Sequence, residues 1–147
     1  MPDPDLVHEV AREWILKAEN DLKTAVHVLK LGEHCPTDSV CFHAQQCVEK
    51  YVKAVLILAG TDFPKTHDLE RLIALSPEGS RPSLSPPEQA LLTDYATGAR
   101  YPGWGEIRLA EARKAVSLAR RVRKELRAEL QKKGLLPNRG RTTRRRR

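Results

Sequence analysis

Apolar residues recur at helical spacing along almost the whole of this 147-residue chain. Spacings of three and four residues place side chains on one face of an α-helix, whereas a strand needs alternation at every second residue. No stretch alternates for long enough to predict a strand. The chain is therefore expected to be all-α, with a single core, because its length leaves room for one ordinary domain.

Five helices are predicted, at about residues 5–31, 38–59, 67–75, 86–98 and 106–133. Thr37 or Asp38 is expected to cap the second helix, and Thr66 the third. The run Ser85-Pro86-Pro87-Glu88 is a capping box that predicts the start of the fourth. The second half of the second helix is apolar nearly all round, which is typical of the central helix of a bundle.

Three apolar faces are expected to point inward. They are Leu6, Val10, Trp14, Ala18, Leu22, Val26 and Leu29 on the first helix, Leu69, Leu72 and Ile73 on the third, and Ile107, Ala115, Ala119, Val122, Leu126 and Leu130 on the fifth.

The formal net charge of +7 is unevenly distributed along the chain. Residues 1–113 carry 12 Lys and Arg against 17 Asp and Glu, whereas residues 114–147 carry 14 against 2. This asymmetry predicts a basic arm for an acidic partner rather than a basic groove. We expect a helical domain over 1–134 and a disordered arginine-rich tail over 135–147. The tail either binds nucleic acid or an acidic protein, or only adds solubility.

Several classes of protein are disfavoured. The longest apolar run, Ala54 to Ala59, is too short to cross a bilayer, and the acidic N-terminus does not resemble a secretory signal. Three cysteines form no even-numbered disulfide framework, so free thiols and a cytoplasmic location are expected. Phosphate-loop, dinucleotide-binding, nucleophile-elbow and His-Glu-x-x-His motifs are absent, so no cofactor is predicted.

Polar residues interrupt the predicted central helix. His43, Gln46, Cys47 and Lys50 lie three or four residues apart and therefore share a face. An unpaired buried polar group costs about 1–3 kcal/mol, so these side chains need partners. One interpretation is a satisfied core network or a polar dimer seam. The other is the wall of a phosphate- or base-binding site.

Histidines and cysteines also cluster around the start of this helix. They are His34, Cys35, Cys41, His43 and Cys47. His43 and Cys47 have an i, i+4 spacing that can hold zinc. There is no Cys-x-x-Cys pair, however, and small thiols suit helix packing, so no metal site is predicted.

Three motifs resemble the HEPN family. They are Phe42-His43-Ala44-Gln45-Gln46 with Val48-Glu49-Lys50 and Lys53-Ala54, then Lys65-Thr66-His67-Asp68-Leu69 with Leu72, and then Ala99-Arg100-Tyr101-Pro102-Gly103. They match in order and spacing over about residues 8–130. The resemblance implies an up-and-down bundle of four long helices plus one short helix, packed as a homodimer. It also implies a separately encoded minimal nucleotidyltransferase as partner, in a toxin–antitoxin-like or nucleotide-handling pair.

Some branches of this family are RNA-cutting toxins that use an Arg followed four to six residues later by His. This chain lacks that spacing, because the first histidine after Arg12 is His27 and none follows Arg100. A nucleotide- or RNA-binding module is therefore favoured over an enzyme. Two alternatives remain: a metal-independent ribonuclease with a composite site of His43, His67 and Arg100, and a scaffold without a ligand.

The candidate nucleotide- or phosphate-binding residues are those that match the family motifs: His43, Gln46, Lys50, His67, Arg100 and Tyr101. Lysine and arginine suit phosphate, tyrosine suits stacking and glutamine suits a base edge. No catalytic residue is assigned. Two structural alternatives stay open: His67 can cap a helix start, and Tyr101 can fill the core of a rigid turn while Arg100 pairs with a carboxylate.

Overall fold

Five α-helices make up most of the computed structural model, which describes residues 3–136. They are α1 (Pro4–Leu29), α2 (Thr37–Leu58), α3 (Leu69–Leu75), α4 (Pro86–Ala96) and α5 (Leu109–Lys132). Short 3₁₀ turns lie at Gly32–His34, Glu78–Ser80 and Gly98–Arg100, and no strand occurs among the described residues. The predicted all-α up-and-down bundle is confirmed. The predicted disordered tail lies almost wholly outside the described residues, while Leu135, at its start, is buried in the core.

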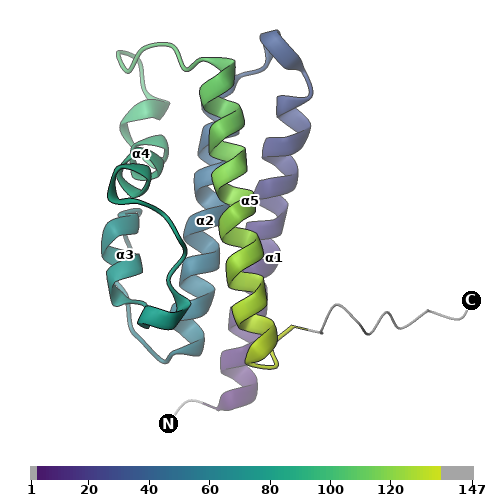
Figure 1. Cartoon of the computed structure of the whole chain (residues 1–147), viewed down its shortest axis with the longest axis vertical. Helices are drawn as coiled ribbons and strands as arrows, with labels where there is room; N and C mark the ends of the chain where they lie inside the picture. The colour runs from purple at the N-terminus through teal and green to yellow at the C-terminus, as the bar shows by residue number, and fades with distance from the viewer. Residues whose placement is uncertain (1–2, 137–147) are drawn as a thin grey trace, which may run out of the picture.

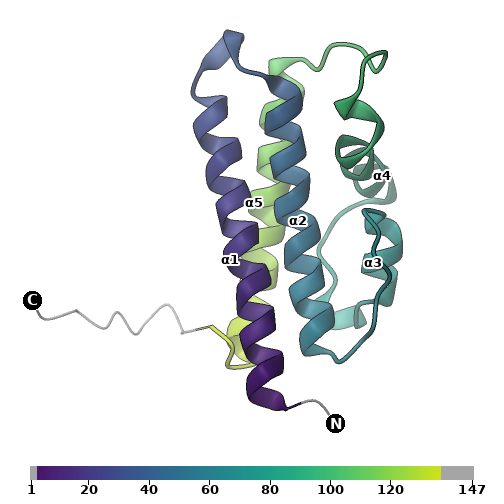
Figure 2. The ribbon, with the colours of Figure 1, turned by 180° about the vertical axis from the view of Figure 1, so that it is seen from behind.

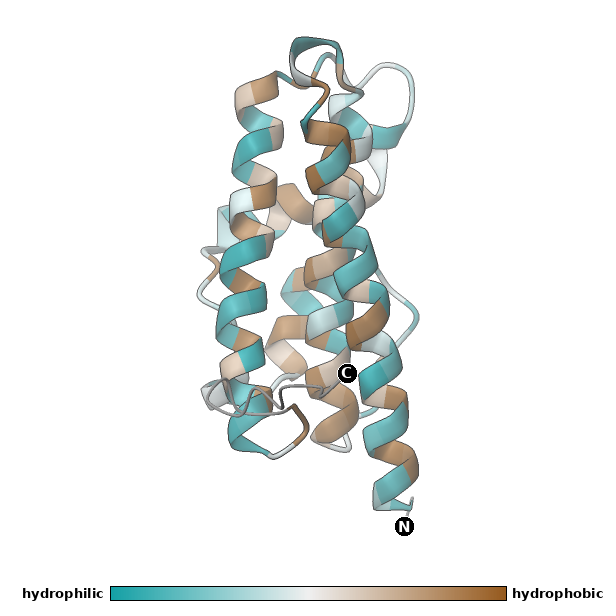
Figure 3. Cartoon of the chain, turned by 90° about the vertical axis from the view of Figure 1, so that its right-hand side faces the viewer, coloured by the Kyte–Doolittle hydropathy of each residue, from teal (hydrophilic) through white to brown (hydrophobic). Residues whose placement is uncertain are grey.

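The helix α2 lies at the centre of the bundle. It packs against α1 and α5 along its length and against α3 and α4 on its remaining side (Figure 1, Figure 2). Its residues from Val40 to Leu56 are buried almost without interruption. Hydrophilic and hydrophobic residues alternate along each long helix, as Figure 3 shows, so each helix presents one face to the core.

The predicted inward faces are confirmed for α3 and α5, and partly wrong for α1. Leu6 is 55% exposed, and the buried stripe of α1 instead follows Ala11, Ile15, Ala18, Leu22 and Ala25. Alanines have no bulk beyond Cβ, so they allow α1 to approach α2 closely. Trp14, Val26 and Leu29 pack only at the edge of the core.

The third helix starts two residues later than predicted, because a different side chain caps it. The carboxylate of Asp68 accepts a hydrogen bond from the backbone N–H of Arg71, so α3 begins at Leu69. Thr66, the predicted cap, instead accepts from the N–H of Asp68. The predicted capping box of Ser85 and Glu88 is confirmed.

The start of α2 is tied to the segment before α5. Pro36 occupies the cap position of α2 and offers no side-chain acceptor, so neither Thr37 nor Asp38 is the cap. The Thr37 hydroxyl instead donates to the carbonyl oxygen of Ile107 at 2.7 Å. Gly103 and Gly105 have φ of +96° and +101°, a backbone conformation that favours glycine. The backbone is still extended at Arg108, after this turn, so α5 starts at Leu109, three residues later than predicted.

Candidate functional site

Two carboxylates organise the polar face of α2. Asp21, on α1, accepts hydrogen bonds from His43 Nδ1 at 2.8 Å and from Lys50 Nζ. The Asp21 side chain is only 12% exposed, so its charge needs these partners. Because an ionised carboxylate can only accept, Nδ1 of His43 carries the proton and Nε2 is the ring nitrogen left for other contacts.

Glu49, on α2 itself, is the centre of a second network. Its carboxylate accepts from Gln45 Nε2 at 2.9 Å, Lys53 Nζ at 3.0 Å and His67 Nδ1 at 2.7 Å. Gln46 joins this network by donating to Gln45 Oε1 at 2.8 Å. The ammonium group of Lys53 also lies 5.3 Å from the centre of the Trp14 ring, a cation–π distance. Among the described residues, no buried side-chain polar atom lacks a hydrogen-bond partner.

Arg100 and Tyr101 lie at the end of the bundle where α2 begins. The Arg100 guanidinium stacks 4.1 Å above the centre of the Phe42 ring, and within residues 3–136 it makes no ion pair. Tyr101 is 66% exposed and fills no core space. The structural alternative for this turn, in which Tyr101 is buried and Arg100 is paired with a carboxylate, is therefore not what the structure shows.

Two hollows open beside these residues. The first has a volume of about 340 Å³ and is lined by Asp38, Ser39, Phe42, His43 and Arg100. The second, of about 550 Å³, includes Arg100 and Tyr101 among its lining residues. Sequence positions 43, 100 and 101 are thus brought to one end of the molecule. Gln46 and His67 belong to the separate Glu49 network, and Lys50 is joined to His43 only through Asp21.

Neither organising carboxylate was among the site residues predicted from the sequence. The sequence does contain a signal for Asp21, because this residue lies on the same face of α1 as the buried Ala18, Leu22 and Ala25. An acidic side chain on a buried face needs a cationic partner. Glu49 gave no comparable signal, since glutamate is common on helix surfaces.

The three cysteines, Cys35, Cys41 and Cys47, are buried free thiols. Burial raises the pKa of Cys41 to about 12, so its reactive thiolate form is scarce at neutral pH. No group of three or more metal-ligating side chains comes together in the described part of the chain. None of its helices is long and apolar enough to span a membrane.

A third acidic centre joins three helices. Glu19 on α1 accepts from the Tyr51 hydroxyl, from Arg123 Nε at 2.8 Å and from Arg127 at 3.0 Å. Burial alone raises the pKa of the Glu19 carboxyl, but the hydrogen bonds from Tyr51 and Arg123 and the two guanidinium charges outweigh it. The pKa of Glu19 is therefore lowered on balance.

This lowered pKa predicts a loss of stability in acid. A carboxyl whose pKa is lower in the folded chain than in the unfolded one, where it is about 4.3, stabilises the fold above that value. The stabilisation is lost as pH falls through the folded-state pKa. Thermal unfolding followed by circular dichroism from about pH 6 to about pH 3 should show a shallower decline for Glu19→Gln than for wild type. The control, Glu33→Gln at an exposed position, should follow wild type; equal slopes for all three proteins would contradict the assignment.

The protein is thus an all-helical bundle whose central helix carries histidine and lysine side chains paired with carboxylates. The chain matches the model of the HEPN domain family over residues 11–137. It belongs to that family, and the predicted resemblance is confirmed.

Three known proteins are similar to this chain in sequence or in structure. Over 63 residues, which are 43% of this chain and 40% of the relative, the chain is 51% identical to the protein named Putative toxin MJ1304 of Methanocaldococcus jannaschii. The match thus spans less than half of that relative. The structure is similar to TT1696 from Thermus thermophilus, with a TM-score of 0.66, 26% identity and coverage of 82% of this chain and 98% of the other. An archaeal HEPN homologue, ST0689, has the same fold, with a TM-score of 0.60, 23% identity and coverage of 82% and 97%.

Proposed function

We propose that this chain is a toxin-type HEPN module that binds the phosphate group of a nucleotide or RNA in the 340 Å³ hollow. The observation that carries the proposal is that His43 and Arg100 both line that hollow. Within the described residues Arg100 has no carboxylate partner, so its guanidinium donors are available to an anion. The relative named as a toxin supports the functional class.

The surroundings of the hollow suit a nucleotide. Phe42 holds the Arg100 guanidinium by stacking at 4.1 Å, which reduces the entropy lost when an anion binds. The exposed Tyr101 ring offers a stacking surface for a base beside the phosphate. Asp38 also lines the hollow and partly offsets the positive charge, so a ligand with further polar groups is favoured over a bare anion.

The remaining candidate residues have supporting roles in this proposal. Lys50 holds Asp21, and Asp21 in turn fixes the orientation of the His43 ring. Gln46 donates one amide N–H to Gln45 and is only 9% exposed, so burial restricts its access to a base edge. His67, whose side chain is 53% exposed, remains open to solvent on one side of its bond to Glu49.

A metal-independent ribonuclease is the second candidate. A carboxylate bound to Nδ1 of a histidine orients Nε2 for proton transfer, and a neighbouring arginine can stabilise phosphate charge. Asp21, His43 and Arg100 supply these groups, which favours a site of His43 with Arg100 over the three-residue composite with His67. Labelled RNA that stays intact with wild-type protein in EDTA would exclude this function.

We also propose that the chain forms a homodimer and acts with a separately encoded minimal nucleotidyltransferase. Exposed apolar residues, including Leu16 on α1 and Leu31 just after it, support an interface between copies. A scaffold without a small ligand is the remaining alternative, and it predicts partner binding that does not depend on His43, His67 or Arg100.

Isothermal titration with ATP and with a short single-stranded RNA tests the binding proposal. Replacing Arg100 by alanine removes a charge-assisted hydrogen bond worth about 1.5–3 kcal/mol, so affinity should fall by about 10- to 100-fold. Arg71→Ala, at an exposed position outside the hollow, is the matched control and should bind as wild type does. Light scattering on the same samples should give the mass of two chains. An absence of heat with both ligands, or equal affinities for Arg100→Ala and wild type, would refute the proposal.

A further inference from the structure

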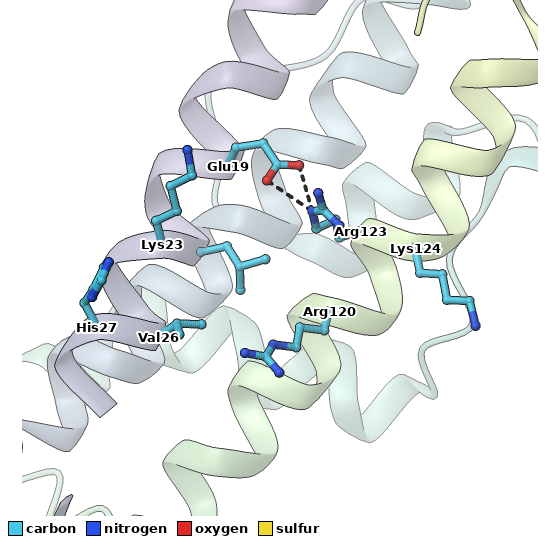
Figure 4. A pocket seen from close by; sticks show the side chains of 8 residues that line it. Glu19, Lys23, Val26, His27, Arg120, Arg123 and Lys124 are labelled. Atoms are coloured by element: carbon cyan, nitrogen blue, oxygen red, sulfur yellow. Dashed lines mark hydrogen bonds and ion pairs between the residues drawn. The ribbon is translucent and has the colours of Figure 1, made fainter. Parts of the chain in front are cut away.

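A groove of about 410 Å³ runs between α1 and α5 (Figure 4) and shares no lining residue with the hollow at His43. Lys23 and His27 project from α1, and Arg120, Arg123 and Lys124 project from α5. Leu22 and Val26 complete the lining. The charge asymmetry of the sequence had favoured a basic arm rather than a basic groove; the fold builds a groove by bringing α5 beside α1.

The charge of this groove is strongly positive. Glu19 is its one acidic lining residue, and the carboxylate is already bound to Arg123 at 2.8 and 3.1 Å. Lys23, Arg120 and Lys124 are exposed and make no ion pair within residues 3–136. Lys23 and Arg120 lie beside the depression, while the Lys124 side chain extends from α5 beyond its rim (Figure 4). These three uncompensated cations create a field that attracts an anionic partner.

The shape of the groove suits a helix. Lys23 and His27 on one wall, and Arg120 and Lys124 on the other, are each four residues apart, which corresponds to about 6 Å along a helix axis. Between these walls lie the buried Leu22 and the partly buried Val26. An amphipathic helix with a row of apolar side chains flanked by carboxylates has the complementary pattern.

From this pattern we infer that the α1–α5 groove is the docking site of an acidic amphipathic helix of a partner protein. Apolar side chains of the partner would cover Leu22 and Val26, while its carboxylates would meet Lys23, Arg120 and Lys124. Docking in this groove is proposed as separate from phosphate binding near His43, because the two sites share no lining residue.

Other occupants fit the groove less well. A symmetric contact with a second copy would place cations against cations, because a two-fold interface uses the same patch on both chains. A single nucleic-acid strand would find charge, but no Phe, Tyr or Trp lines the groove to stack a base, and the apolar lining would face polar sugar and phosphate groups.

A designed peptide provides the test. The probe is a fluorescein-labelled peptide of about 16 residues, about 24 Å long as a helix, with leucines at i, i+3, i+4 and i+7 flanked by glutamates. A scrambled peptide of the same composition lacks the apolar row, and a twelve-nucleotide oligouridine is the third probe. Fluorescence anisotropy is measured with full-length wild type, with Arg120→Glu/Lys124→Glu, and with Arg71→Glu/Arg113→Glu. Both double variants carry the same change in net charge.

Wild type and the Arg71/Arg113 variant should bind the amphipathic peptide equally, and the Arg120/Lys124 variant should bind it at least about tenfold more weakly. The scrambled peptide should also bind at least about tenfold more weakly than the probe. Equal weakening in both variants, or equal affinity for both peptides, would show attraction by net charge alone and overturn the inference. So would binding of oligouridine, but not of the peptide, that depends on Arg120 and Lys124, since it would assign the groove to nucleic acid.

Discussion

Replacing Glu49 by leucine should lower the free energy of unfolding by about 3–5 kcal/mol, because the change leaves the buried Lys53 charge without its partner. The Glu49 side chain is 3% exposed and that of Lys53 is 9% exposed, so water does not replace the lost ion pair. Gln45 and His67 lose an acceptor at the same time. Urea unfolding followed by far-UV circular dichroism, at one fixed protein concentration, measures the effect.

The double variant Glu49→Leu/Lys53→Met is the control for this interpretation. It removes both charges and keeps their volume apolar, so it should be more stable than Glu49→Leu alone by about 1–3 kcal/mol. Recovery should be incomplete, because Gln45 still lacks its acceptor. A double variant no more stable than the single one would show that packing, rather than the unpaired Lys53 charge, accounts for the loss.

Replacing Leu126 by alanine should cost about 2–5 kcal/mol, because it opens a cavity in the core between α5 and α2. Leu126 is 2% exposed and lies in the main hydrophobic cluster. The matched substitution Leu6→Ala, on a side chain that is 55% exposed, should change stability by less than about 0.5 kcal/mol. Urea unfolding followed by far-UV circular dichroism measures the free energy of unfolding of both variants. Similar losses for the two would mean that Leu6 is covered in solution.

Much of the fold could be predicted from local pattern. The capping box at Ser85, the inward face of α5 and the central place of α2 depend on residues close together in the chain, so periodicity and cap chemistry reveal them. The face of α1 was less predictable. Alanine is small and only weakly hydrophobic, so Ala11 and Ala25 do not stand out in the pattern, whereas Leu6 suggests a core position but is 55% exposed.

The candidate site was predictable in its residue types but not in its pairings. His43, Lys50 and His67 are recognisable from motifs, whereas their pairing with Asp21 and Glu49 is established only by distances between side chains of different elements. Arg100 could be predicted as a cation near the last turn. That it stacks on Phe42 and shares a hollow with His43 depends on how that turn meets the start of α2.

The amino-acid sequence by itself determined the helical class, the family and the identity of the polar side chains, because periodicity, caps and motif spacing are local properties. Tertiary structure alone decided which charges neutralise one another and which remain open, since Coulomb energy depends on distance in space and on burial. For that reason Asp21 and Glu49 neutralise the cations on α2, while Arg100, Lys23, Arg120 and Lys124 make no ion pair within residues 3–136.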